Sequence, residues 1–235
     1  MPVSPSITRL LSHPGRKGLV QRLQKKGFTL IEMLVVVAII ALVAAAVTPM
    51  VFSQMMATRI TSAGESMAGL LSLARQLAVS GNQEVEVRFY QYAEPATPGS
   101  TVGFRAVALV RSAGQAKGPG TGAGAGTQLG QQLSDTFFLP SGITVSGSAM
   151  MSPPLTIFTS SPDREGIIKK VQGATFRAFH FYPDGSTDFQ EHAIVANRCY
   201  FTLGEERVIA DGSVPKNFYA VQVDPTSGRV ISYRP

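Results

Sequence analysis

Residues 25–47 read KKGFTLIEMLVVVAIIALVAAAV, and this stretch decides the fold. From Phe28 onward the run carries only two polar side chains, Thr29 and Glu32. As a helix rising about 1.5 Å per residue, residues 28–47 would be about 30 Å long, the thickness of the hydrocarbon core of a bilayer. The sequence therefore predicts a membrane-spanning helix near the N-terminus.

The segment before this helix is basic. Residues 1–27 hold six of the 21 Lys and Arg residues and no Asp or Glu, so 15 basic and 15 acidic residues remain over 28–235. Positive charge before a span holds the N-terminus in the cytoplasm, so we expect a single-pass protein whose C-terminal part has crossed the membrane. Residues 28–235, in which positive and negative charges balance, lack the concentrated basic face of a nucleic-acid-binding domain. No nucleic-acid partner is therefore expected.

Other interpretations of the apolar stretch stay open. A secretory signal peptide has a shorter apolar region and would be cut near Ala44–Ala46. A simple signal anchor has no use for Glu32, because a carboxylate at the centre of a bilayer costs about 2.5–3.5 kcal/mol. Near the cytoplasmic edge, Glu32 would instead be protonated or reach the interface. A helix buried in a soluble core would leave the basic leader without a role.

The residues around Gly27 resemble a known processing motif. Residues 25–32, KKGFTLIE, followed by an apolar run, are similar to the prepilin motif of type IV pilins and type II secretion pseudopilins. The resemblance implies cleavage between Gly27 and Phe28 by a membrane prepilin peptidase and N-methylation of Phe28. It also implies that Glu32 pairs with the Phe28 amine of a neighbouring subunit, and that Pro49 bends the helix.

Beyond the apolar stretch a helical period continues. Residues 28–80 are expected to form one helix, a membrane half followed by an amphipathic half, with Gly81 as a left-handed cap. We expect the amphipathic half to pack on the protein's own sheet, and a coiled-coil seam is the alternative. Seven apolar residues at spacings of three and four form the predicted stripe: Met56, Ile60, Ala63, Met67, Leu70, Ala74 and Leu77.

From Asn82 onward the apolar period changes from 3.6 to 2. Val85, Val87 and Phe89 alternate with charged residues, which predicts a strand with one buried face and a hairpin partner at 101–111. Further short strands are predicted at 136–139, 143–146, 155–159, 174–182, 193–202, 217–223 and 229–233.

The predicted fold class is α+β, a long N-terminal helix packed on an antiparallel β-sheet head at 81–235. Within the head, residues 112–130 are rich in glycine and have the composition of a flexible loop. Glu205 and Glu206 are expected to form a solvated turn.

Parts of the head extend the resemblance. Phe181–Phe189, Val223–Val230 and Leu139–Ile143 are similar to segments of minor pseudopilins of the type II secretion H or fimbrial T kind. Val85–Tyr92 and Phe104–Val110 resemble the pilin-like member D of the Verru_Chthon gene cassette. The resemblance implies a pilin-like fold and a structural subunit, a minor pseudopilin, of a type II secretion pseudopilus or a type IV pilus-like filament. A major or adhesive pilus subunit is the alternative.

The same resemblance implies a location and a set of partners. The protein would be held in the bacterial inner membrane with its head in the periplasm, and would enter a filament after processing. Its partners would be the prepilin peptidase, other pilin or pseudopilin subunits, the inner membrane and an exported protein substrate.

Residues suited to catalysis or metal binding are scarce. Cys199 with His180 or His192 could form a thiol–imidazole pair beside Asp184, but Cys199 lies in an apolar strand pattern typical of a buried, inert thiol. Asp184 and Asp188 share a turn that could bind calcium, although calcium takes six to eight oxygen ligands. We therefore predict no enzymatic activity, no cofactor and no metal site. A signal-anchored periplasmic enzyme is the alternative.

Overall fold

The computed structural model covers most of the chain beyond the leader. It describes residues 27–95, 99–111, 130–169, 171, 173–192 and 198–235, without the side chains of residues 47–52. The chain divides into two compact units, residues 1–48 and 49–235. The predicted leader and glycine-rich loop lie outside the described residues, except for Gly27 and Gly130.

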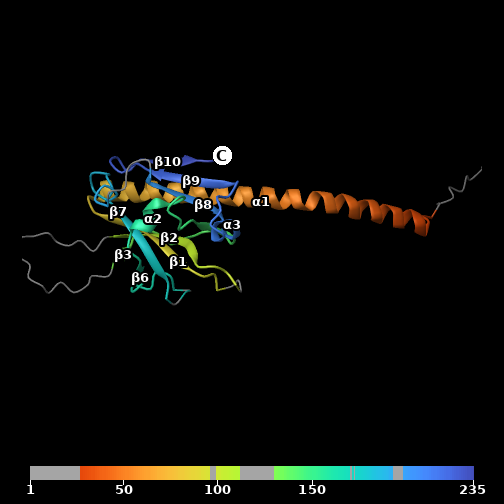
Figure 1. Ribbon diagram of the computed structural model, residues 1–235, viewed down its shortest axis with the longest axis horizontal. Coiled ribbons are helices and arrows are strands. Elements are labelled where there is room, and N and C mark those ends of the chain that lie inside the picture. The colour runs from red at the N-terminus through yellow and green to blue at the C-terminus, as the bar shows by residue number, and fades with distance from the viewer. Residues whose placement is uncertain (1–26, 96–98, 112–129, 170, 172, 193–197) are drawn as a thin grey trace, which may run out of the picture. The chain divides into compact units, whose positions relative to one another are not determined.

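One long helix, α1 (Leu30–Gly81), starts in the first unit and ends in the second (Figure 1). It continues through Pro49, and a bend at this proline stays a prediction. Among the residues that the structure describes, no helix combines the length and the hydropathy needed to cross a membrane. At the C-terminal end, Asn82 and not Gly81 adopts the left-handed conformation, with φ of 43°, which asparagine tolerates better than most residues.

The second unit is built around a ten-stranded sheet (Figure 1). Its main path runs β10-β9-β8-β5-β2-β1-β7-β6, while β3 and β4 pair with β2, and all these pairings are antiparallel. The bounds of the strands are β1 (Val85–Tyr92), β2 (Gly103–Arg111), β3 (Gln131–Gln132), β4 (Phe137–Phe138), β5 (Ile143–Val145), β6 (Ser161–Pro162), β7 (Thr175–Phe181), β8 (Tyr200–Glu205), β9 (Phe218–Val223) and β10 (Val230–Tyr233).

Some local predictions differ from the structure. Instead of a strand at 155–159 there is a short helix, α2 (Pro153–Ile157), because its two leading prolines suit the first turn of a helix. The strand predicted at 193–202 is β8, which starts only at Tyr200, and residues 193–197 lie outside the described part. Glu206 does not lie in a solvated turn but begins a second short helix, α3 (Glu206–Ala210).

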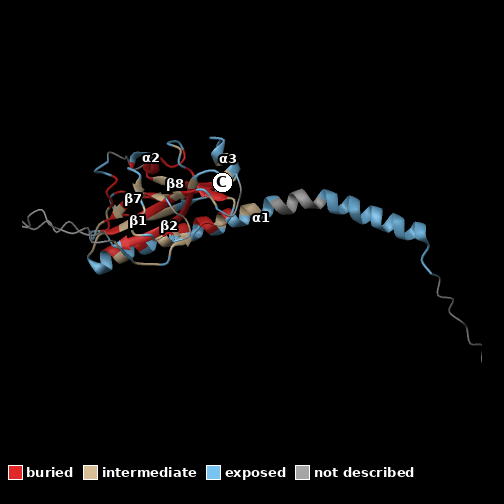
Figure 2. Ribbon diagram, turned by 90° about the horizontal axis from the view of Figure 1, so that it is seen from below, coloured by how far each residue is buried: buried red, intermediate tan, exposed pale blue. Residues whose placement is uncertain are grey.

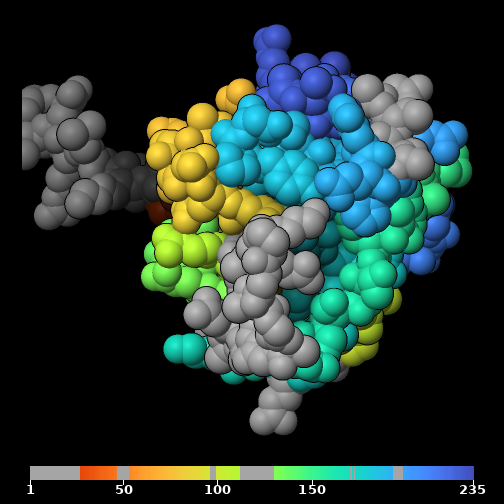
Figure 3. Space-filling view, turned by 90° about the vertical axis from the view of Figure 1, so that its left-hand side faces the viewer, coloured from red at the N-terminus to blue at the C-terminus, as the bar shows by residue number. Residues whose placement is uncertain are grey.

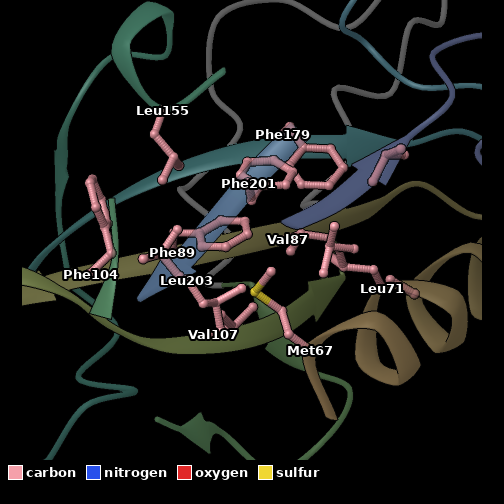
Figure 4. Close-up of a cluster of buried hydrophobic side chains, with 14 of the residues drawn as sticks. Met67, Leu71, Val87, Phe89, Phe104, Val107, Leu155, Phe179, Phe201 and Leu203 are labelled. Atoms are coloured by element: carbon pink, nitrogen blue, oxygen red, sulfur yellow. The ribbon is translucent and has the colours of Figure 1, made fainter. Parts of the chain in front are cut away.

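The amphipathic half of α1 packs on one face of the sheet, as predicted. Figure 4 shows Met67 and Leu71 directed at side chains of the strands, among them Phe89 and Phe201, whose ring centroids are 4.7 Å apart. The buried stripe consists of Ile60, Ala63, Met67, Leu71, Ala74 and Ala78.

The stripe departs from the predicted one at three positions, and one of them is Met56, which is only partly buried. Leu71 and Ala78 are buried, whereas Leu70 and Leu77 are only partly buried. The predicted spacings repeat every 3.5 residues on average, while a straight helix has 3.6 residues per turn and drifts by about 20° per heptad. The buried face therefore moves forward by one residue, as expected for a straight helix on a sheet and not for a coiled-coil seam.

The opposite face of the sheet is also covered in part. Arg88, predicted to lie on an exposed face of β1, is only 5% exposed. It belongs to the face where Tyr90, Phe176 and Ile168 form a second hydrophobic cluster. The Arg88 guanidinium donates to Glu165 (2.8 Å) and lies 4.3 Å from the centroid of the Phe176 ring, so the buried charge is paired.

Candidate functional site

The N-terminal segment of the first unit starts α1 with a cap. The Thr29 hydroxyl accepts a hydrogen bond from the Glu32 N–H (3.3 Å), and the Thr29 carbonyl accepts one from the Met33 N–H (3.2 Å). Thr29 and Glu32 have the spacing of a capping box, and a carboxylate in the first turn is favoured by the partial positive charge of the helix N-terminus. The sequence analysis assigned no role to Thr29, although this spacing could have identified it.

Glu32 is exposed and makes no ion pair with any residue that the structure describes. A Cβ at Gly27 would meet no described atom within 4 Å, and Gly27 does not have a positive φ. Neither packing nor backbone conformation in this structure therefore requires a glycine at position 27. A requirement for glycine at position 27 would have to come from a partner protein that recognises this segment.

The apolar side chains that follow are uncovered. Phe28 is 71% exposed and Leu30 is 84% exposed, and each described side chain from Leu30 to Ala46 is classed as exposed (Figure 2). A continuous apolar surface of this size marks a site for contact with lipid or protein. Cleavage between Gly27 and Phe28 would place a new α-amine at the start of that surface.

In the head, two of the segments singled out from the sequence lie side by side. The turn after β7 meets the turn between β9 and β10, where the Thr187 N–H donates to the Pro225 carbonyl (2.9 Å). A Cβ on Gly228 would approach the Gly185 carbonyl to 2.2 Å, so the close contact needs a glycine. Arg75 of α1 donates to a backbone carbonyl of the second turn (2.7 Å) and ties both turns to the helix.

The two calcium candidates make separate contacts. Asp184 accepts hydrogen bonds from the Ser186 hydroxyl (2.6 Å) and N–H (2.8 Å), and these bonds lower the pKa of Asp184. Asp188 instead places Oδ2 2.9 Å from His180 Nδ1. Within the described ranges, no group of three or more His, Cys, Asp or Glu side chains is arranged to hold a metal ion.

A cavity of about 430 Å³ lies beside His180, on the side of the sheet away from α1, and is called the His180 cavity below. Carboxylates and imidazoles line it together: Glu84, Glu86, Asp188, Glu191, His180 and His192. Figure 3 shows the surface hollowed between atoms coloured as residues near 160 and atoms coloured as residues near 185. Pairing of β1 with β7 builds the cavity, because it places Glu86 opposite His180.

The titratable groups of the His180 cavity influence one another. Burial alone would lower the pKa of His180, but the hydrogen bond to Asp188 and the carboxylates of Glu84 and Glu86 raise it above its ordinary value. Burial and the hydrogen bond that Tyr182 donates to Glu191 (2.8 Å) raise the pKa of Tyr182. The cavity can therefore hold a proton on His180, and its carboxylates are hydrogen-bond acceptors.

The residues of the alternative enzyme hypothesis are not assembled in this cavity. Neither Cys199 nor Asp184 lines it, although His180 and His192 do. Cys199 is fully buried, and burial, together with Asp224, raises the pKa of its thiol to about 12. Because the thiolate is the reactive form, Cys199 has the character of a buried, inert thiol, as predicted.

Comparison with known proteins bears on the N-terminal segment. Residues 22–48 match the family described as "Prokaryotic N-terminal methylation motif". No curated protein sequence matches the chain significantly. Among solved structures, the minor pseudopilin EpsH from the type 2 secretion system of Vibrio cholerae matches with a TM-score of 0.37 and 12% identity, over 75% of this chain and 98% of that one.

The matched segment contains Gly27, Phe28 and Glu32 and continues into the uncovered start of α1. The fold beyond it is α+β, a helix packed on an antiparallel sheet, as predicted. The chain therefore carries a prokaryotic N-terminal methylation motif at residues 22–48, the segment whose residues resemble the prepilin motif.

Proposed function

We propose that the chain is a structural subunit, specifically a minor pseudopilin, of a type II secretion pseudopilus or a type IV pilus-like filament. The methylation motif at 22–48 carries this proposal, because it runs directly into an apolar helix surface that nothing in the described chain covers. In this scheme a prepilin peptidase cuts between Gly27 and Phe28, and Phe28 is then N-methylated.

The cut has two physical consequences. It removes all six basic residues of the leader, which held the N-terminus in the cytoplasm. It also creates a cation, the Phe28 amine, that can meet the Glu32 carboxylate of a neighbouring subunit. Opposite charges attract more strongly in an apolar surrounding than in water, so the pair gains strength inside a bundle of helices.

Assembly then exchanges lipid for neighbouring helices. Lipid tails are as apolar as leucine, so this exchange gains nothing from removing apolar surface from water. Side-chain packing along residues 28–47 and the pair between Phe28 and Glu32 must supply the free energy. The capping bond of Thr29 supports this step, because it fixes the first turn of the helix, which carries Glu32 and begins two residues after Phe28.

Before processing and assembly, the chain has three parts in this scheme. Residues 1–27 are the leader, residues 28–80 are the helix that anchors the subunit in the inner membrane, and residues 81–235 are the periplasmic head. The head would contact other pilin or pseudopilin subunits and an exported protein. The two joined turns next to Arg75 support a firm attachment of the amphipathic half of α1 to the sheet within the head.

Substitution of Gly27 tests the processing step. We expect Gly27→Glu to abolish cleavage, because a charged side chain at the cut replaces a glycine that the fold itself does not need. The measurement is the mass of the chain isolated from membranes that contain a prepilin peptidase. Gly18→Glu, which adds the same charge within the leader, is the matched control and should mature normally. Normal maturation of Gly27→Glu would contradict the proposal.

Abundance tests the minor role. If the chain is a minor subunit, sheared filaments should contain far fewer copies of it than of the most abundant pilin or pseudopilin. The measurement is quantitative mass spectrometry of those filaments. Copy numbers equal to the most abundant subunit would favour the major-subunit alternative and leave the processing step untouched.

A further inference from the structure

We propose that the His180 cavity binds a protruding Arg or Lys side chain of a partner protein. The inference goes beyond the proposed function, because it concerns the head and needs neither cleavage nor a filament. It rests on the charge of the cavity, an unsatisfied buried acceptor and the aromatic side chains of its wall.

The first argument is charge. Four carboxylates line the cavity, and none of the described residues that line it is Lys or Arg. Glu86 is neutralised from outside the cavity by Arg88 (2.9 Å), whereas the one ion-pair partner of Glu84 among the described residues is His180, at 3.9 Å. The cavity therefore presents more negative charge than its own imidazoles can balance, and it favours a cation.

The second argument is an unsatisfied acceptor. Asp188 is 3% exposed, and its Oδ2 faces His180, but its Oδ1 has no hydrogen-bond donor among the described residues. Buried carboxylate oxygens in folded proteins are nearly always hydrogen-bonded, and Asp188 lines the cavity with one oxygen that has no donor among the described residues. An ammonium or guanidinium group supplies such a donor with a positive charge.

The third argument is shape. The wall of the cavity, which has a volume of about 430 Å³, includes the aromatic rings of Phe158, Phe176 and His192. The Phe176 ring already lies 4.3 Å from the Arg88 guanidinium, which leaves Phe158 and His192 for a ligand. The Phe158 and His192 rings meet edge to face with centroids 4.9 Å apart. Aromatic faces attract cations and cover the alkyl stems of Lys and Arg, while carboxylates bind the charged ends. A metal ion fits less well, because the described carboxylates and imidazoles do not converge as ligands.

A short peptide tests the proposal on the full-length protein in detergent micelles. The probe is acetyl-Gly-Arg-Gly-amide, and its twin carries citrulline, which has nearly the same shape as arginine but no charge. The chain has three histidines, so the ring signals of His180 and His192 can be resolved by NMR after histidine labelling. We expect the arginine peptide to shift both signals saturably and the citrulline peptide to leave them unmoved.

Variants locate the binding. Glu84→Gln should weaken binding of the arginine peptide about tenfold, because it removes a charged hydrogen-bond acceptor while leaving the fold intact. Asp188→Asn should weaken binding at least as much, but this buried residue also holds His180 in place. If Asp188→Asn fails to fold, Glu84→Gln is the variant that decides the test. Glu65→Gln, an exposed carboxylate on α1 outside the cavity, is the matched control and should bind like the unsubstituted chain.

Three results would overturn the proposal. The first is equal binding of the arginine and citrulline peptides. The second is unchanged arginine binding in Glu84→Gln. The third is a shift of the same histidine signals by calcium chloride alone that also blocks the peptide, because the cavity would then be a metal site. None of these results depends on processing, so failure here leaves the proposed function standing.

Discussion

The two halves of α1 have opposite surroundings. From Leu30 to Ala46 each described side chain is exposed, whereas from Ile60 to Ala78 six residues form a buried stripe against the sheet (Figure 2). A helix with one apolar stripe is satisfied by one partner surface, but a helix that is apolar all round needs cover on every side. The second half therefore builds the head of its own chain, and the first half is left for lipid or for other subunits.

Substitutions of two glycines in the amphipathic half of α1 should have the largest effect on the stability of the head. A Cβ on Gly64 would lie 2.2 Å from the ring of Tyr219, whereas a Cβ on Gly69 would meet nothing within 4 Å. Gly64→Ala should lower the free energy of unfolding of the head by about 1–3 kcal/mol through overpacking. Gly69→Ala, the matched control, should raise it by about 1 kcal/mol, because alanine favours a helix.

Thermal unfolding of both variants in the same detergent measures these changes. Equal stability of Gly64→Ala and the unsubstituted chain would mean that the helix does not press against Tyr219 as the structure has it. The contrast between the two halves of α1 would then lose its structural basis.

Glu32→Ala addresses the other half. Processing should remain intact, and incorporation into filaments should fall about tenfold, because a charged pair between subunits is lost. The thermal stability of the head should not change, since Glu32 belongs to the first compact unit and the sheet belongs to the second. Quantification of the variant in sheared filaments is the measurement, with Glu65→Ala as the control. Undiminished incorporation would refute the role of Glu32.

Acidification should have a smaller effect on stability, and this effect should be confined to the head. The hydrogen bond from Arg105 lowers the pKa of Glu206 below its ordinary 4.5, and Arg105 is 3% exposed. A carboxyl with a lowered folded-state pKa stabilises the fold above its ordinary pKa, and this stability is lost as the pH falls through the lower folded value. Glu206→Gln should therefore be less stable than the unsubstituted chain at pH 7 and should lose less stability on acidification.

Urea unfolding at pH 7 and near pH 3 measures this difference, and Glu205→Gln is the neighbouring control. A Glu206→Gln variant with the same pH dependence as the unsubstituted chain would exclude a role for this pair. In neither variant should the N-terminal half of α1 change its stability with pH.

Local patterns were sufficient for much of the fold. The apolar run and the helical period predicted α1, and the alternation at Val85–Phe89 predicted the β1–β2 hairpin, because each depends on residues close in sequence. The burial of Arg88 was not predictable in this way. It requires the segment around Ile168 to fold over the outer face of β1, and that contact joins distant parts of the chain.

The two candidate sites differ in the same way, because one is formed by residues close in sequence and the other by residues far apart in sequence. The segment from Gly27 to Glu32 is contiguous, so its motif was readable from the sequence and is confirmed by the match at 22–48. The His180 cavity was not predictable from the sequence, because Glu84 and His180 come together only through the pairing of β1 with β7. The pattern within a single turn therefore indicates Asp188 as a calcium candidate but does not predict its contact with His180.

The most direct measurement is the N-terminal sequence and intact mass of the chain extracted from membranes that contain a prepilin peptidase. Our account predicts a polypeptide that begins at Phe28 and carries one N-methyl group. A mature chain that begins at Met1 or at Val47 would contradict it and would leave a tethered or secreted domain in place of a filament subunit.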